Sequence, residues 1–248
     1  MAAGADVKDL HRLWAYVSVA SHWWGTRGIV HRTVEHLRLS GVSVLAAAVL
    51  VVPVAAWLGH VGRGGVAAQW VVNVGRAVPS LAILSLVFPF ALRYGFGLGF
   101  WPTFVPLVLL AAPPLFTNTY VGVRGVDPET VDGARGMGLR PAQVLTRVEL
   151  PAAAPIVFAG VRIAVLQVIA TATLGAFVGF NGLGSFIDEG FRQQDDGKLL
   201  TGAIAVSLVA LAVDALLGLA ARRATPWRRG PATASRADVD HPVAGSPT

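Results

Sequence analysis

Residues 127–151 read DPETVDGARGMGLRPAQVLTRVELP and form a polar island in a very apolar chain. Three arginines alternate there with four acids, Gly136 and Gly138 interrupt the stretch, and Leu150-Pro151 closes it. The sequence on both sides is apolar over lengths that can cross a bilayer, for which a helix needs about 20 residues. Ordering a long charged segment costs conformational entropy that contacts must offset. The island therefore predicts a docking element for a partner on one side of a membrane.

The overall composition favours a membrane protein. Of the 248 residues, 54% are hydrophobic and 14% are charged, whereas soluble domains carry about 25% charged residues. The sequence pI of about 10.7 suits basic loops beside an anionic membrane leaflet. Nucleic-acid binding is disfavoured because the arginines are scattered among loops and form no basic stripe. The chain has no cysteine, which excludes disulfides and cysteine metal sites.

We expect an all-α integral membrane protein with about five transmembrane helices. Prolines and glycines within the spans favour helices around a transport path, because broken helices are tolerated where they face other helices or a water-filled cavity. Residues 1–38 are expected to form an interfacial arm, since their Trp and Tyr residues favour the headgroup level. Residues 39–221 would form the membrane domain, and residues 222–248 a disordered basic tail. The expected spans are residues 39–59, 66–92, 100–120, 152–180 and 199–221.

The basic residues of the short loops predict the orientation. Arginines are frequent in the polar island and in the tail, so both are expected to be cytoplasmic. The acidic loop 181–198 would then lie outside, together with the N-terminal arm in spite of its arginines.

The sequence contains no nucleotide-binding loop. The pattern G-x-x-x-x-G-K-[ST] is absent, and neither Lys8 nor Lys198, the only lysines, follows such a pattern. Uphill transport would therefore depend on an ion gradient or on another subunit.

The island resembles the EAA loop of binding-protein-dependent ABC importer permeases. In that pattern Glu-Ala-Ala is followed by three residues, a Gly, nine residues and Ile-x-Leu-Pro. Here Asp132-Gly133-Ala134, Gly138 and Val148-Glu149-Leu150-Pro151 stand at the same spacing. The departures are Asp for Glu, Gly for Ala and Val for Ile, and Gly133 weakens a short helix by about 1 kcal/mol relative to Ala.

A wider resemblance, over about residues 34–222, is to the osmoprotectant subfamily of these permeases, which serves glycine betaine, carnitine and choline. It implies the type I importer permease fold with a cytoplasmic coupling helix, in the cell membrane of a bacterium. The implied partners are an ATPase subunit that uses the ATP, a second permease subunit, an external substrate-binding protein and membrane lipids. No cofactor is implied for this chain. The segments that carry the resemblance are residues 118–123, 134–138, 151–162, 171–173 and 182–184.

The resemblance assigns the contact with the ATPase to the island. Asp132 is expected near the start of a short helix, where a carboxylate stabilises the positive end, and Gly138 is expected to end that helix. Met137 and Leu139 would offer an apolar contact to a groove on the partner, and Leu150-Pro151 would start the next span. The full set of expected coupling residues is Asp132, Gly133, Ala134, Met137, Gly138, Leu139, Leu150 and Pro151.

Polar residues inside apolar spans are expensive and are candidates for the translocation path. For Asn118, Thr171 and Thr173, lining the path and bonding between helices are equally favoured. Asp214 is expected to form a structural ion pair with Arg162 or Arg76. Trp57, Trp70, Tyr94 and Trp101 are interpreted as interface anchors rather than as a cage for a quaternary ammonium group. The path candidates are Asn73, Arg76, Asn118, Arg162, Gln167, Thr171 and Thr173.

Other functions remain open at this point. The same machine could carry another small zwitterion or an amino acid. An ion-coupled carrier would usually show an internal repeat of spans, and the sequence shows none. A membrane enzyme would need an acid/base or metal constellation, but the histidines have no metal-ligand spacing within a span. We therefore expect no catalytic residue and no metal site.

Overall fold

The computed structural model describes residues 11–65, 70 and 79–224, and every regular element in them is a helix. The expectation of an all-α protein is confirmed. The α-helices are α2 (Ile29–His60), α4 (Ser80–Arg93), α5 (Phe100–Arg124), α6 (Pro128–Gly136), α7 (Pro141–Val144), α8 (Leu150–Thr171), α9 (Gly184–Gln193) and α10 (Asp196–Ala224). Short 3₁₀ helices cover η1 (Ala20–His22) and η3 (Ala172–Val178), and a π-helical turn covers η2 (Leu145–Glu149).

Four helical segments of the described residues are long and apolar enough to span a membrane. They match the expected first, third, fourth and fifth spans, and they cover Ile29–His60, Phe100–Arg124, Pro141–Val178 and Asp196–Ala221. The expected second span lies partly outside the described residues. Its described part is the 14-residue helix α4, about 21 Å long and thus shorter than the ~30 Å hydrocarbon core.

The first span begins earlier than expected, at Ile29 rather than at Leu39. The polar residues before Leu39 suggested an interfacial arm, but Arg32 and His36 are buried within the protein. His36 Nε2 donates to the carbonyl oxygen of Ile169 at 2.9 Å, which joins α2 to the end of α8. The last ten residues of the expected arm are therefore the first turns of α2, since that helix is continuous from Ile29 to His60.

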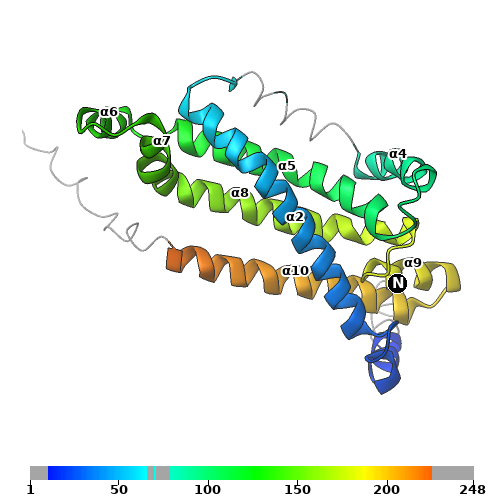
Figure 1. Cartoon of the computed structure of the whole chain (residues 1–248). Helices are drawn as coiled ribbons and strands as arrows, with labels where there is room; N and C mark the ends of the chain where they lie inside the picture. Colours follow the sequence, from blue (N-terminus) through cyan, green and yellow to red (C-terminus); the bar gives the residue numbers. More distant parts are fainter. Residues whose placement is uncertain (1–10, 66–69, 71–78, 225–248) are drawn as a thin grey trace, which may run out of the picture.

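Helices α2, α5 and α8 form the core of the molecule and lie side by side in Figure 1. Alanines at their contacts, Ala47, Ala111 and Ala164, are completely buried. Small residues let helix backbones approach closely, which gives van der Waals packing where lipid offers no hydrophobic driving force. Leu39, Leu107, Leu115 and Val168 fill the space between them.

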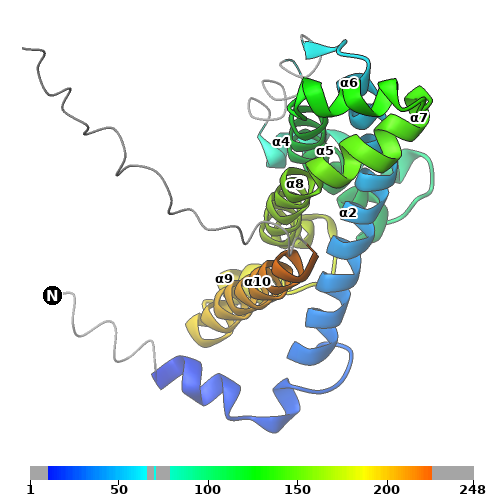
Figure 2. The same cartoon turned by 90° about the vertical axis from the view of Figure 1, so that its left-hand side faces the viewer.

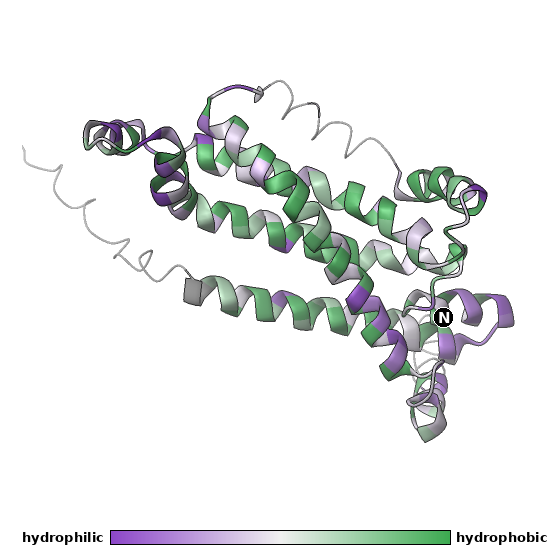
Figure 3. Cartoon of the chain, in the orientation of Figure 1, coloured by the Kyte–Doolittle hydropathy of each residue, from purple (hydrophilic) through white to green (hydrophobic). Residues whose placement is uncertain are grey.

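The molecule has two polar ends. Figure 1 shows α6 and α7 at one end of the helices and α9 with the N-terminal segment at the other. Figure 3 shows hydrophilic residues gathered at both ends and hydrophobic residues along the spans between them. Helix α10 runs beside the core, and none of the apolar window of this span is buried. Its apolar surface is therefore left for lipid or for another chain.

The loop expected over residues 181–198 contains the amphipathic helix α9. Phe186 is buried there and packs with Ile29 and Leu183. Gly190 allows a close approach to α10, because a Cβ atom at this position would lie 2.6 Å from the Leu199 nitrogen. The helix was hidden in the sequence because the four acids and the glycines of residues 181–198 are typical of a loop.

Candidate functional site

Helix α6 begins at Asp127, whose side chain caps it. The Asp127 carboxylate accepts bonds from the Glu129 and Thr130 backbone N–H groups, both at 3.3 Å, and Pro128 occupies the first turn. Asp132 lies in the middle of the helix, where it pairs with Arg135 at 3.2 Å. The expectation that Asp132 stabilises the start of the helix was wrong, because the cap is formed one turn earlier.

The helix ends as expected at Gly138. The Gly138 N–H donates to the Arg135 carbonyl at 2.9 Å, and the Leu139 N–H donates to the Ala134 carbonyl at 3.3 Å. These two bonds close the helix in a Schellman motif, which places the glycine in a left-handed conformation. Gly138 has φ of +85°, a region that L side chains rarely adopt.

One face of α6 packs on the rest of the loop. Val131, Ala134 and Val144 are buried together, and Leu139 packs against them. Leu139 is therefore half-buried within the loop itself and does not stand free for a partner, which corrects the expectation from the sequence. Met137, at 77% exposed, projects into the surroundings instead. Asp132, Gly133 and Arg135 share this exposed side.

The chain returns to the membrane at Pro141, earlier than the expected start at Leu150-Pro151. The Arg140 N–H donates to Gln143 Oε1 at 2.9 Å and so caps α7. The helix then continues without interruption through η2 into α8. Pro151 lacks a backbone donor and crowds the preceding turn. The wider π-helical turn directly before Leu150 accommodates it, so the proline lies within the helix rather than at its start.

A buried hydrogen bond between a histidine and a carboxylate connects this helix to α2. His60 Nδ1 donates to Glu149 Oε2 at 2.6 Å, and both side chains are 5% exposed. Glu149 belongs to the π-helical turn and His60 is the last residue of α2. We did not predict this pair from the sequence. The sequence feature that could have indicated it is the acidic residue between Val148 and Leu150, next to the apolar residues of a span.

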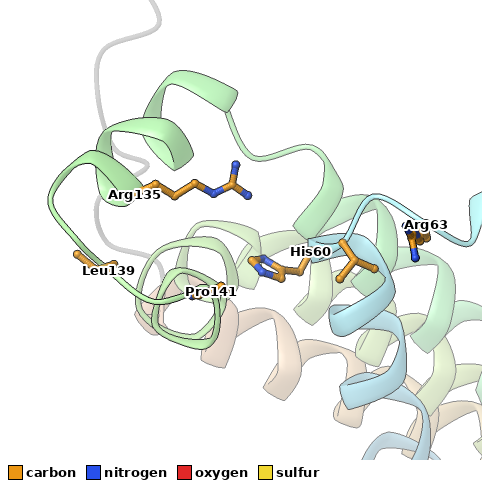
Figure 4. A pocket seen from close by; sticks show the side chains of 6 residues that line it. His60, Arg63, Arg135, Leu139 and Pro141 are labelled. Carbon is orange, nitrogen blue, oxygen red and sulfur yellow. The ribbon is translucent and has the colours of Figure 1, made fainter.

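A cavity of about 520 Å³ lies between the loop and the end of α2. Figure 4 shows that the Arg135 side chain from α6 and His60 from the end of α2 border this cavity. The cavity separates the loop from α2 at the surface, whereas the His60–Glu149 pair joins α2 to the helix that follows the loop. The residues that line the cavity are His60, Val61, Arg63, Arg135, Leu139 and Pro141.

The capping of α6 predicts a pH dependence. The hydrogen bond from the Thr130 hydroxyl and those from the Glu129 and Thr130 amides lower the pKa of Asp127. A carboxyl with a lowered folded pKa adds stability above its unfolded pKa, about 3.9, and this stability is lost as pH falls through the folded pKa. We expect hydrogen exchange at Glu129 and Thr130, corrected for intrinsic rates, to become less protected below about pH 3.9. Asp127→Asn keeps a cap acceptor and should remove this dependence, and an equal loss of protection in that variant would contradict the assignment.

The path candidate Asn118 packs at a helix crossing. Its Nδ2 donates to the carbonyl oxygen of Pro114 at 2.8 Å, within α5. Gly160 of α8 faces it so closely that a Cβ atom would lie 2.6 Å from Asn118 Cβ. The sequence left open whether Asn118 lines the path or bonds between helices, and its side-chain hydrogen bond stays within α5.

The predicted ion pair of Asp214 is formed with Arg162. Arg162 Nε and Nη2 donate to the two carboxylate oxygens at 2.5 and 2.6 Å, which joins α8 to α10. Gln167, Thr171 and Thr173 are half-buried, and the Thr173 hydroxyl donates to the Ala170 carbonyl at 2.7 Å. Asn73 and Arg76 lie outside the described residues. Of the described path candidates, Asn118 therefore lies at the contact of α5 with α8, and Arg162 at the contact of α8 with α10.

The Arg162–Asp214 pair should affect the stability of the protein mainly because each side chain balances the charge of the other. We expect Asp214→Leu to lower the thermal unfolding midpoint, because it leaves a guanidinium group unpaired within the spans. The double variant Arg162→Leu/Asp214→Leu should be more stable than Asp214→Leu alone. Thermal unfolding of the purified protein in detergent would measure both. A double variant less stable than the single one would refute this account.

No group of three or more His, Asp or Glu residues suited to a metal ion occurs within residues 11–65, 70 and 79–224. The helices and the loop define a class of protein, a multi-span membrane protein whose charged loop is continuous with a candidate span. The chain belongs to the family described as binding-protein-dependent transport system inner membrane component, which matches residues 45–226. It is thus a transporter subunit and not an enzyme, as the sequence predicted.

Several relatives share most of their length with this chain. The choline transport system permease protein OpuBB of Bacillus subtilis (strain 168) is 33% identical over 80% of this chain and 89% of its own length. The carnitine transport permease protein OpuCB of Listeria monocytogenes is 36% identical over 79% of this chain and 87% of its own length. The osmoprotectant import permease protein OsmY of Salmonella typhimurium (strain LT2) is 34% identical over 77% and 80%.

Solved structures show the same fold. The MetNI methionine ABC transporter, in an inward-facing conformation, matches with a TM-score of 0.65 and 24% identity, over 80% of this chain and 95% of that chain. An amino acid ABC transporter solved with histidines matches with a TM-score of 0.64 and 19% identity, over 79% and 93%. The expected fold of type I importer permeases is confirmed.

Proposed function

We propose that this chain forms, with a second permease subunit, the membrane path of an ATP-driven importer for a compatible solute such as glycine betaine, carnitine or choline. An ATPase subunit would hydrolyse the ATP, and a binding protein would deliver the solute from outside. The names of the relatives from Bacillus, Listeria and Salmonella support this solute class. The polar island and the C-terminus would face the cytoplasm of a bacterium.

The observation that carries the proposal is the construction of the loop. Helix α6 is capped at both ends and packs through Val131 and Ala134 on Val144 of the following helix. That helix continues as one span from Pro141 to Val178. A displacement of α6 by an ATPase subunit would therefore move a rigid body that includes a span. The His60–Glu149 pair would pass the movement on to α2.

The exposed side of α6 would be the docking surface. Asp132, Arg135 and Met137 are presented there, and Met137 is the exposed large apolar residue among them. An apolar side chain on a short helix can enter a groove of a partner, while the charged neighbours fix its orientation. Within the spans, we propose that Gln167, Thr171 and Thr173 face the path, because they lie half-buried at the end of α8 and the start of η3.

The test is ATP hydrolysis by the reconstituted importer. Replacing residues 132–138 with a Gly/Ser linker should abolish solute-stimulated hydrolysis. Met137→Asp should weaken assembly with the ATPase subunit, because it buries a charge in an apolar contact. Phe191→Asp is the matched control, since Phe191 is 75% exposed at the opposite end of the molecule. Solute-stimulated hydrolysis that persists with the linker would overturn the docking role.

A further inference from the structure

A second cavity, of about 630 Å³, lies at the end of the molecule opposite α6. The segment before α2, the first turns of α2, α9 and the start of α10 surround it. Figure 2 shows the N-terminal segment beneath α9 and α10, at the lower end of α2. The volume is in the usual range for a pocket that holds a small molecule, about 300–1,000 Å³. Neither the coupling loop nor the proposed translocation path includes this cavity.

Arg32 is the unusual residue in the wall of this cavity. Only 2% of the residue is exposed. Its Nη2 donates to Glu189 Oε1 at 2.8 Å, and its guanidinium carbon lies 4.5 Å from the centroid of the Phe186 ring. Its Nε and Nη1 atoms have no hydrogen-bond partner among the described residues. A buried charge with unsatisfied donors is costly, so it favours an additional acceptor at this place.

The charges around Arg32 also favour an anion. Glu189 is shared, because Lys198 Nζ lies 2.7 Å from its other carboxylate oxygen. One carboxylate thus serves two cations that are largely covered, and Arg27 adds a third cationic side chain to the lining. The lining therefore carries an excess of positive charge beside donors that are not saturated. A second carboxylate would balance this excess and could accept bonds from a guanidinium group in a bidentate manner.

Aromatic rings provide a different surface in the same cavity. Tyr16 and Trp24 belong to its lining. The faces of such rings attract quaternary ammonium groups through cation–π interactions. The lining thus offers cationic donors for a carboxylate and aromatic surface for a methylated ammonium group.

The segment before α2 is held in place by local bonds. The Val30 N–H donates to the Trp23 carbonyl at 3.2 Å, and His22 Nδ1 bonds to the Tyr16 carbonyl at 2.8 Å. Gly28 makes the turn possible, because a Cβ atom there would lie 2.6 Å from the carbonyl oxygens of Trp23 and Trp24. Arg12 forms an ion pair with Asp196 at the start of α10. These contacts order the backbone of the segment that carries Tyr16 and Trp24 before any ligand arrives.

We infer that this cavity is a binding site for a small zwitterion, with the carboxylate directed to Arg32 and Arg27 and the quaternary ammonium group to Tyr16 and Trp24. The inference rests on the proposed function for the choice of solute. It adds a site at the entrance end of the permease itself, separate from the binding protein and from the path between the spans. It also separates the solutes, because glycine betaine and carnitine carry a carboxylate and choline does not.

The test measures equilibrium binding to the complete permease–ATPase complex in nanodiscs, without the binding protein. Glycine betaine and carnitine should bind, and choline should bind at least about tenfold more weakly, because it cannot pair with the cationic donors. Arg32→Gln and Arg27→Gln should each weaken glycine betaine binding by about tenfold. Arg38→Gln is the matched control, an arginine of α2 whose side chain is 70% exposed, and should leave binding unchanged.

The possible outcomes are distinct. Equal binding of choline and glycine betaine, or unchanged binding in a folded Arg32→Gln complex, would overturn the site. If Arg32→Gln does not assemble, Arg27→Gln decides, and unchanged binding in that variant overturns the site as well. If the complex binds no solute and Arg32→Gln instead weakens capture of the binding protein, the carboxylate belongs to that protein and the inference fails.

A second measurement, solute uptake, separates the inference from the proposed function. Solute uptake by the complete importer, with binding protein and ATP, reports on the proposed function alone. Uptake that is intact in a complex with no solute bound at this cavity overturns only the inference. Binding without ATP-dependent uptake of any compatible solute overturns only the proposed function.

Discussion

Replacing His60 with alanine is expected to destabilise the protein by about 3–5 kcal/mol, because it leaves the buried Glu149 carboxylate without its partner. The two side chains are 2.6 Å apart and 5% exposed, so in the folded protein the imidazole takes the place of water as a partner of the carboxylate. Thermal or denaturant unfolding of the purified complex would measure the loss. His31→Ala is the matched control, since His31 is an exposed histidine of the same helix.

Two further variants separate a lost partner from lost packing. Glu149→Gln keeps an acceptor for the imidazole and should cost much less than His60→Ala. The double variant His60→Leu/Glu149→Leu removes both polar groups and should recover part of the stability. Equal shifts for His60→Ala and His31→Ala would show that the pair contributes nothing. Under the proposed function, His60→Ala should also reduce solute-stimulated ATP hydrolysis, because α2 loses its polar link to the helix that follows the coupling loop.

Gly184→Ala is expected to cost more than about 3 kcal/mol, or to prevent folding, although it adds a single methyl group. A Cβ atom at Gly184 would lie 2.1 Å from the Thr173 carbonyl oxygen and 2.6 Å from its carbonyl carbon. These are backbone atoms, so no side chain can move aside. The measurement is the yield of folded protein and its unfolding midpoint, and we expect a loss of folded protein or a large fall in the midpoint.

The same substitution at Gly133 serves as the control, and its effect on stability should have the opposite sign. A Cβ atom at Gly133 meets nothing within 4 Å, and the residue lies in the exposed middle of α6. Gly133→Ala should therefore stabilise the helix by roughly 0.5–1 kcal/mol, because alanine loses less backbone entropy. If both variants were equally destabilised, the close approach at Gly184 would not be the cause.

Much of the architecture followed from local patterns. The apolar runs that became α5, α8 and α10 were recognisable because their length and composition alone suit a bilayer. The end of α6 at Gly138 was also predicted, since a glycine between a polar helix and Arg140-Pro141 is a local signal. The spacing from Asp132 to Pro151 supported the family, which the match over residues 45–226 confirmed.

Other expectations failed where a contact distant in the sequence decides the structure. Arg32 and His36 looked like residues of an interfacial arm, but Glu189 and the Ile169 carbonyl are their partners. Leu139 looked available for a partner, but it packs against the buried residues of its own loop. Leu150-Pro151 looked like the start of a helix, but a π-helical turn before it lets the helix continue from Pro141.

By itself, the sequence determined that the chain is a helical membrane protein, and that the polar island of residues 127–151 has the spacing of an importer permease. These properties depend on hydropathy and on residues near one another in the chain, so no tertiary information is needed. Only the tertiary structure decided that Glu149 pairs with His60, that Arg162 pairs with Asp214 and that Arg32 lies beside a cavity with unsatisfied donors. A charged or polar side chain finds its partner by distance in space, and 89, 52 and 157 residues separate Glu149 from His60, Asp214 from Arg162 and Glu189 from Arg32.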